Sequence, residues 1–210
     1  MPDYYPIFVD LRGKRTVVVG GGVVAQRKIE SLLEYGAVVT LISPEATPRL
    51  QEMAADGVIC WLRRPYRPGD LEGAIIVVGA TNSKEANTLI SAEANERGVL
   101  VNIVDDPELC SFIVPSVLSR GSLLVAVSTQ GRSPSLAQMV RRRLEEAIGP
   151  EYGLMADLMG RLRPEVLRMG ASEAERASIW KRVLASRAME LLREGRIEEA
   201  EEEARACLSR

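Results

Sequence analysis

The feature that most constrains this chain is the stretch at residues 16–28, which reads TVVVGGGVVAQRK. A β-branched run leads into Gly20, Gly21 and Gly22, and residues that favour a helix follow. The spacing is G-x-G-x-x-A, with Ala25 where a third glycine is common. The stretch therefore predicts a buried strand, a tight turn and a helix, which open a parallel α/β sheet of the Rossmann type.

This turn is suited to a pyrophosphate. Gly20 allows the sharp change of direction, Gly22 lets the backbone approach the phosphates, and Ala25 lets the helix pack on the strand. The start of the helix adds free N–H groups and a partial positive charge. Glycine-rich turns also occur without a ligand, but here a strand precedes the turn, and a helix and a second strand follow it. This context favours dinucleotide binding.

Strands and helices alternate through the first half of the chain. We expect strands at residues 16–19, 38–42, 58–62, 75–78 and 99–104, and helices at 24–35, 48–56 and 84–97. Asn82 or Ser83 is the expected cap of the last of these helices. The near-continuous Val and Ile runs predict a parallel sheet covered on both faces.

The alternation ends after Asp106 and Pro107. Two strands at 112–119 and 123–128 form a hairpin-like unit, and Ser133 and Pro134 open a helix that runs to about residue 148. From residue 151 onward the sequence is amphipathic and helical. The predicted division is a Rossmann-like α/β domain at 1–113, a unit of strands plus a helix at 114–149, and a C-terminal helical domain at 150–210.

The 210 residues include no histidine. This excludes imidazole bases, Ser-His-Asp triads and histidine-ligated metals, so acid–base chemistry falls to carboxylates, Lys, Tyr or Cys. Cys60, Cys110 and Cys207 lie far apart and form no C-x-x-C pair, which predicts a cytoplasmic protein without structural zinc. A net charge of -2 and the absence of a long apolar run predict no nucleic-acid or membrane partner.

Polar residues follow the second strand. Simple dinucleotide folds hold the ribose hydroxyls with an acid at this position. Here Ser43 takes that place, Pro44 follows, and Glu45 comes two residues late. Ser43 can hydrogen-bond a ribose, or Ser43 and Pro44 can simply start the next helix, and both interpretations stay open. No arginine follows the strand directly to seat a 2′-phosphate, which favours NAD over NADP.

The turn at 79–82 follows the fourth strand, at the sheet edge where ligands bind in open α/β folds. Its small residues Ala80 and Thr81 either face a cofactor or serve only as part of a helix cap. The sequence does not choose between these two interpretations.

The most informative polar cluster is NIVDDP at residues 102–107, which begins with Asn102. Asp105 and Asp106 follow a buried strand at the same sheet edge. One interpretation is a plain Asx turn before Pro107. The other is that one aspartate faces the nicotinamide and acts as general base, a role that no histidine can take here.

A hydroxyl-rich loop at 128–134 contains Ser128, Thr129 and Arg132 and precedes a helix. It can bind anionic groups through its side chains and the helix N-terminus, or it can be an ordinary connector. Arginines outnumber acids from 114 to 149, with Arg120 and a run at 141–143. This local excess favours a polyanionic partner.

At these residues the chain resembles a known family, the precorrin-2 dehydrogenases that form the NAD-dependent part of sirohaem synthase. The resemblance lies in YYPIFVDLRGKRTVVVGGGVVAQRK, NIVDDPELCSFIVPS and LLVAVSTQGRSPSLAQMVR. It implies oxidation of precorrin-2 to sirohydrochlorin by NAD, in a homodimer whose dimerisation region is about 114–149 plus the helices beyond. Some members also insert ferrous iron, and the sequence leaves this second activity open. No resident metal ligand is expected.

The resemblance assigns to Asp105 the role of accepting a proton as hydride leaves. The residues expected to contact the tetrapyrrole are Asn102, Arg120, Ser128, Thr129 and Arg132. The expected NAD-binding set is Gly20, Gly22, Val23 and Val24 at the pyrophosphate, Ser43, Pro44 and Glu45 at the adenosine, and Ala80 and Thr81. The alternative function is a regulatory module that senses NAD without turnover.

Overall fold

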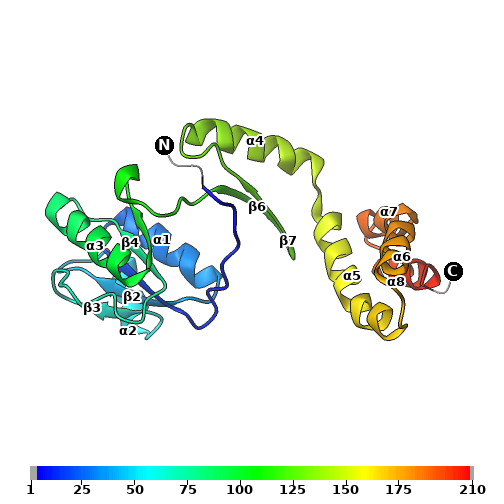
Figure 1. Ribbon diagram of the computed structural model, residues 1–210, viewed down its shortest axis with the longest axis horizontal. Coiled ribbons are helices and arrows are strands. Elements are labelled where there is room, and N and C mark those ends of the chain that lie inside the picture. Colours follow the sequence, from blue (N-terminus) through cyan, green and yellow to red (C-terminus); the bar gives the residue numbers. More distant parts are fainter. Residues whose placement is uncertain (1–3, 209–210) are drawn as a thin grey trace. The chain divides into compact units, whose positions relative to one another are not determined.

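Five short strands, most of them rich in Val, Ile and Leu, pair in parallel and form one sheet with the strand order β3-β2-β1-β4-β5. The computed structural model describes residues 4–208 and groups the chain into two units, 1–114 and 115–210. Figure 1 shows the sheet of the first unit with its helices. The strands are β1 (Arg15–Val19), β2 (Val38–Ile42), β3 (Cys60–Leu62), β4 (Ile76–Gly79) and β5 (Leu100–Ile103).

Alternate residues of the strands bury against opposite faces, as a two-residue period requires. Val18 belongs to one cluster, with residues of α1 (Val23–Glu34) and α2 (Pro48–Ala55). Val17 and Val19 belong to the other cluster, with residues of α3 (Lys84–Arg97). The sheet is therefore covered on both faces, which confirms the predicted Rossmann-type arrangement.

The strand order reverses at β1, since β2 and β3 lie on one side of it and β4 and β5 on the other. The register aligns the carboxyl ends at one edge, because Val19 pairs with both Ile42 and Gly79, and Gly79 pairs with Ile103. Open α/β sheets bind ligands at the crevice outside this reversal. The fold therefore directs the search for a site to the loops after β1, β2, β4 and β5.

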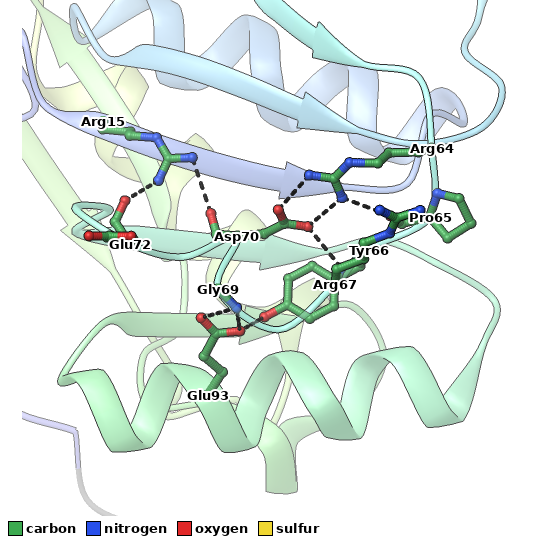
Figure 2. A network of polar contacts seen from close by, with 9 residues as sticks. All are labelled: Arg15, Arg64, Pro65, Tyr66, Arg67, Gly69, Asp70, Glu72 and Glu93. Atoms are coloured by element: carbon green, nitrogen blue, oxygen red, sulfur yellow. Dashed lines mark hydrogen bonds and ion pairs between the residues drawn. The ribbon is translucent and has the colours of Figure 1, made fainter.

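Residues 63–75 connect β3 to β4 without a helix or a strand, and we call them the crossover segment. Its Leu71 is fully buried in the same cluster as Val17 and Ile90. Polar contacts hold the rest of the segment (Figure 2). Arg64 donates two hydrogen bonds to Asp70, at 2.8 and 2.6 Å.

A second set of contacts fixes the crossover segment to α3. Glu93 of α3 is buried and accepts hydrogen bonds from the Tyr66 hydroxyl at 2.5 Å and from the Gly69 N–H at 3.0 Å. Arg97 of the same helix forms an ion pair with Glu93 at 2.7 Å. Burial alone would raise the pKa of Glu93, but these hydrogen bonds and the charge of Arg97 outweigh burial, so that pKa lies below its usual value.

The second unit contains an antiparallel hairpin of β6 (Ser116–Arg120) and β7 (Leu123–Val127), followed by α4 (Pro134–Ala147). Four helices come next, and they enclose a core cluster of their own that includes Leu158, Val183 and Leu192. They are α5 (Pro150–Arg168), α6 (Glu173–Ala185), α7 (Ala188–Arg193) and α8 (Ile197–Ala206). The prediction of a hairpin, a helix and a helical C-terminal part is confirmed.

One predicted strand starts too early. Residues 112–115 are not part of β6, because the N–H groups of Ser111 and Phe112 donate to the carbonyl of Val101 and hold this segment against the first unit. A short 3₁₀ helix, η1 (Pro107–Leu109), also precedes it and was not predicted. The three-part division of the chain stays a prediction.

Two carboxylates, the half-buried Asp70 of the crossover segment and the buried Glu93 of α3, predict an acid-sensitive first unit. Hydrogen bonds from Arg64 lower the pKa of Asp70, as the contacts above lower that of Glu93. A carboxyl whose pKa falls on folding stabilises the protein above its unfolded-state pKa, and this stabilisation is lost as the pH falls. We expect the free energy of unfolding to drop below about pH 4.5.

Chemical denaturation at a series of pH values checks this expectation. Glu93→Gln keeps an oxygen that accepts a hydrogen bond but cannot titrate, so its free energy of unfolding should fall less steeply between about pH 4.5 and 3. Equal slopes for parent and variant would show that Glu93 does not contribute.

Candidate dinucleotide-binding site

Two glycines of the turn between β1 and α1 are required by the neighbouring loops. Gly20 has φ 107°, and a Cβ placed on it would lie 2.2 Å from the carbonyl oxygen of Ala80. A Cβ on Gly21 would lie 2.0 Å from the carbonyl oxygen of Glu45. The loops after β1, β2 and β4 therefore pack so closely that no side chain fits at either glycine.

Gly22 differs, because no atom lies within 4 Å of the position its Cβ would take. It is the N-cap of α1, with ordinary backbone angles of φ -80° and ψ -176°, and its carbonyl accepts the hydrogen bond of Gln26 at 3.0 Å. The N–H groups of the first turn precede that bond and have no partner within the helix. Open space beside free N–H groups and a helix N-terminus is what a pyrophosphate requires.

Gly22 opens onto a cleft of about 790 Å³ at the carboxyl edge of the sheet. The structure brings all nine predicted cofactor residues to its lining: Gly20, Gly22, Val23, Val24, Ser43, Pro44, Glu45, Ala80 and Thr81. The side chains of Val23 and Val24 are 57% and 43% exposed, so these apolar groups are available to a ligand. The role of each residue in binding stays a prediction.

At the β2 end of the cleft, Ser43 is buried and tied to β3. Its N–H donates to Leu62 at 3.2 Å, and its carbonyl accepts the indole N–H of Trp61 at 2.9 Å. The helix that follows is capped instead by Thr47, whose hydroxyl accepts from the Leu50 N–H at 3.4 Å. The interpretation that Ser43 and Pro44 start this helix is therefore wrong, while both residues do line the cleft.

At the β4 end, capping and lining fall to different residues. Ser83 caps α3 by accepting from the Ala86 N–H at 3.1 Å, as one of the two predicted caps. Thr81 accepts from the Ser83 N–H at 2.9 Å, and the Asn87 amide donates to the Thr81 carbonyl at 3.2 Å. The loop is thus rigidly held while Ala80 and Thr81 face the cleft.

Asp105 lies in the turn after β5, exposed and with φ 60°, a left-handed conformation that is uncommon outside glycine. The preceding residue, Val104, donates its N–H to Gly79 at 2.8 Å, which ties this turn to the end of β4. Asp105 is not among the residues that line the cleft. It lies at the same sheet edge, one strand further from β1 than Ala80.

The alternative of a simple Asx turn before Pro107 is not what the structure shows. Pro107 has no N–H to bond an Asp105 side chain, and the Asp106 side chain makes no capping hydrogen bond to η1. The turn is held by Cys110 instead, whose sulfur accepts from the Ile103 N–H at 3.1 Å and donates to the Asp106 carbonyl at 3.2 Å.

The predicted tetrapyrrole residues have structural contacts. The Asn102 amide donates to the Phe112 carbonyl at 3.0 Å, within the first unit. In the second unit, Arg120 donates to the carbonyls of Ile148 and Glu145, at 3.0 and 3.3 Å, and so bonds the C-terminal end of α4. Their role in substrate binding stays a prediction.

The loop at 128–133 holds the remaining three predicted substrate residues. The Thr129 hydroxyl accepts from the Ser133 N–H at 2.8 Å, the Ser128 hydroxyl accepts from the Gln130 N–H at 2.9 Å, and Arg132 is exposed. Arg120 pairs with Leu123 at the turn of the hairpin, whereas this loop follows the other end of β7. The structure therefore does not bring Arg120 together with Arg132 in the hairpin.

Within residues 4–208, no three acidic or cysteine side chains come close enough to hold a metal ion. Over the same residues, no helix is long and apolar enough to cross a membrane.

Three family models match successive segments of the chain. Residues 7–116 match a family described as "Putative NAD(P)-binding", residues 120–147 match the central region of a sirohaem biosynthesis protein, and residues 151–208 match a sirohaem synthase dimerisation region. The chain belongs to the sirohaem synthase family. The family resemblance read from its motifs is confirmed.

The relatives are longer proteins. The chain is 42% identical to siroheme synthase 3 of Aeromonas hydrophila, over 88% of this chain and 39% of that one. It is 43% identical to the siroheme synthase of Methylobacillus flagellatus, over 85% and 38%, and 38% identical to that of Photorhabdus laumondii, over 96% and 43%. The chain thus spans about two fifths of the length of these relatives.

The chain is also similar to a solved structure along nearly its whole length. This structure is of a precorrin-2 dehydrogenase that is 25% identical to the present chain, with a TM-score of 0.78. The match covers 97% of the present chain and 100% of the other. The fold class predicted from the sequence is thereby confirmed for both units. The family's dimerisation region matches residues 151–208 of this chain. The sequence analysis expected this region to begin earlier, with residues 114–149, and to include the helices beyond.

The cleft contains two residues that the sequence analysis missed, Pro65 and Tyr66 of the crossover segment. A signal for them exists. They follow β3 closely, and in a parallel sheet every residue that directly follows a strand is placed at the carboxyl edge. The strand at 58–62 was predicted, but the residues after it carry no known dinucleotide motif.

Gly22 provides a direct test of the cleft. Gly22→Ala should leave the free energy of unfolding nearly unchanged, because the position is open and its backbone angles suit alanine. The added methyl group would occupy the space of the phosphates, so we expect NAD to bind at least about tenfold more weakly. Isothermal titration and thermal unfolding measure the two effects.

The neighbouring Gly21→Ala is the matched control. Its methyl group would meet the Glu45 carbonyl, so this variant should lose stability as well as affinity. Full NAD affinity in Gly22→Ala would contradict a phosphate site at this turn.

Proposed function

We propose that this chain is an NAD-dependent precorrin-2 dehydrogenase, which oxidises precorrin-2 to sirohydrochlorin. The observation that carries the proposal is the match to a precorrin-2 dehydrogenase over that protein's entire length. The named siroheme synthases alone would not suffice, because the chain covers only about two fifths of each. The open glycine turn and its cleft supply the cofactor site that such a reaction needs.

Residues after β1 bind the cofactor, and a residue after β5 accepts the proton. The turn at Gly20 and Gly22 and the start of α1 bind the pyrophosphate through N–H groups, which orients the dinucleotide along the carboxyl edge of the sheet. Bound NAD supplies the hydride acceptor. Asp105, an exposed carboxylate after β5, acts as a general base and accepts a proton from the substrate as the hydride leaves it.

The residues that follow β2 support NAD, rather than NADP, as the cofactor of this site. Glu45 is exposed and lines the cleft, and its negative charge would repel a 2′-phosphate. Ser43 and Pro44, the other lining residues there, carry no positive charge. A titration with NADP beside NAD measures this preference.

Two further parts of the proposal concern assembly and location. Residues 151–208 match a dimerisation region, which supports a homodimer. The three cysteines are all free, which supports a reducing, cytoplasmic setting. Iron insertion into the product is a separate activity, and the same assay with added ferrous ion decides whether this chain has it.

A regulatory module that binds NAD without turnover is the competing function. The whole-length match to a dehydrogenase favours the enzyme. The decisive assay follows NADH absorbance after precorrin-2 is added to protein and NAD. An enzyme produces NADH and sirohydrochlorin together, whereas a sensor binds NAD and produces neither.

Substitution of Asp105 tests the proton acceptor. Asp105→Asn keeps the shape of the side chain and suits the left-handed backbone, because asparagine is among the few residues that tolerate it. We expect the rate of NADH formation to fall about 100-fold or more, since a positioned base contributes at least that much. NAD affinity and thermal stability should stay at the parent values.

Asp106→Asn, one residue further on, is the control for a general loss of negative charge at this turn. It should retain most of the activity, because Asp106 is bonded through its backbone carbonyl rather than its carboxylate. A fully active Asp105→Asn, or equal losses in the two variants, would remove Asp105 from the mechanism.

A further inference from the structure

The crossover segment contributes an aromatic residue, Tyr66, to the lining of the cleft. Pro65 and Tyr66 line it together with Ile42 and Ser43 of the β2 end. Their place follows from the sheet, because β3 pairs with β2 and the Ser43 N–H donates to the carbonyl of Leu62, the last residue of β3. Residues that follow β3 therefore begin beside the loop that follows β2.

The position of Asp105 indicates which half of a dinucleotide reaches this end. Asp105 follows β5, while β2 and β3 lie on the opposite side of β1. This step rests on the proposed function. With the pyrophosphate at Gly22 and the nicotinamide directed toward the proton acceptor, the other nucleoside extends toward β2 and β3.

We propose that Tyr66 contacts the adenine ring of the bound dinucleotide and that Glu93 is the residue that positions Tyr66 for it. Three apolar residues, Ile42, Pro44 and Pro65, line the cleft together with Tyr66. Adenine is flat and apolar on both faces, so an aromatic side chain provides a favourable surface for it. Glu93 lies on α3 and is not among the cleft-lining residues.

The contacts of Figure 2 explain how a segment without regular structure keeps that ring in place. Glu93 accepts from the Tyr66 hydroxyl and from the Gly69 N–H, and it is itself paired with Arg97. Burial and the hydrogen bond to Glu93 raise the pKa of Tyr66, so the hydroxyl remains a donor at neutral pH. The phenol is thus fixed at its hydroxyl in a residue that lines the cleft.

The remaining contacts fix the segment on both sides of the tyrosine. Arg64 forms an ion pair with Asp70 at 2.6 Å, and the Arg67 N–H donates to the same carboxylate at 2.8 Å. Arg15 of β1 donates to the carbonyls of Asp70 and Glu72. Since these contacts form within the protein alone, the adenine wall is organised before a ligand arrives, and less conformational entropy is lost on binding.

A purely structural role is the competing explanation, because Tyr66 also packs against the cluster that contains Leu71. The two explanations differ in what they predict for the halves of the cofactor. A structural role affects all ligands alike. An adenine contact affects ADP and NAD but leaves nicotinamide mononucleotide binding unchanged.

The experiment measures the affinities of NAD, ADP and nicotinamide mononucleotide by isothermal titration. Tyr66→Leu keeps apolar bulk but loses the aromatic face, and we expect NAD and ADP to bind about tenfold more weakly, as loss of one stacked base contact implies. Tyr66→Phe keeps the ring but loses the hydroxyl that bonds to Glu93, so it should bind ADP more weakly than the parent and more tightly than Tyr66→Leu. Nicotinamide mononucleotide should bind each variant as it binds the parent.

Glu93 is tested through its conservative variant. Glu93→Ala removes the acceptor of Tyr66 and should weaken ADP binding, whereas Glu93→Gln keeps an acceptor and should restore it. Tyr35→Ala is the matched control, because Tyr35 is an exposed tyrosine of the same unit that does not line the cleft. Thermal unfolding of each variant shows whether the protein remains folded at the temperature of the titration.

The outcomes separate this inference from the proposed function. Unchanged ADP affinity in Tyr66→Leu, or equal weakening of ADP and nicotinamide mononucleotide, overturns the adenine contact while dehydrogenase activity stands. A parent protein that binds NAD and ADP but forms no NADH with precorrin-2 overturns the proposed reaction and leaves the adenine contact supported by the Tyr66 variants. A parent that binds neither ligand overturns both.

Discussion

The close approach of three loops at the carboxyl edge of the sheet is the constraint on which the site depends. Gly20 lies against the Ala80 carbonyl and Gly21 against that of Glu45, both too close for any side chain. The Thr47 N–H also donates to the Gly21 carbonyl at 2.9 Å. The loops after β1, β2 and β4 are thereby fixed as one rim, and Gly22 is left open where a phosphate would lie.

The sequence predicted the structure correctly where local residue patterns determine the conformation. The G-x-G-x-x-A turn and the Val-rich runs predicted the sheet, and all nine expected cofactor residues line one cleft. It failed where tertiary contacts decide the outcome. Phe112 reads as the start of a strand but is held against β5, and Thr47 rather than Ser43 caps α2. Neither contact leaves a periodic signal in the sequence.

The crossover segment shows why part of the site could not be found from motifs. A helix there would carry a 3.6-residue period. This coil is instead held by contacts of Arg15, Asp70 and Glu93, which join residues up to 57 positions apart. Such charged residues read as a solvated surface in a sequence. Their burial requires that each charge be paired, and that pairing fixes one conformation of the segment.

The backbone of Asp105 adds a separate argument for its function. A left-handed conformation at a residue with a side chain is unfavourable, and glycine would relieve it without altering the Ile103 and Asp106 contacts to Cys110. The structure nonetheless places an exposed carboxylate at this position, at the sheet edge that carries the cofactor residues. In a chain without histidine, a carboxylate is one of the few groups able to accept a proton near neutral pH. Strained backbone clusters at functional sites, and this supports the proposed role of Asp105.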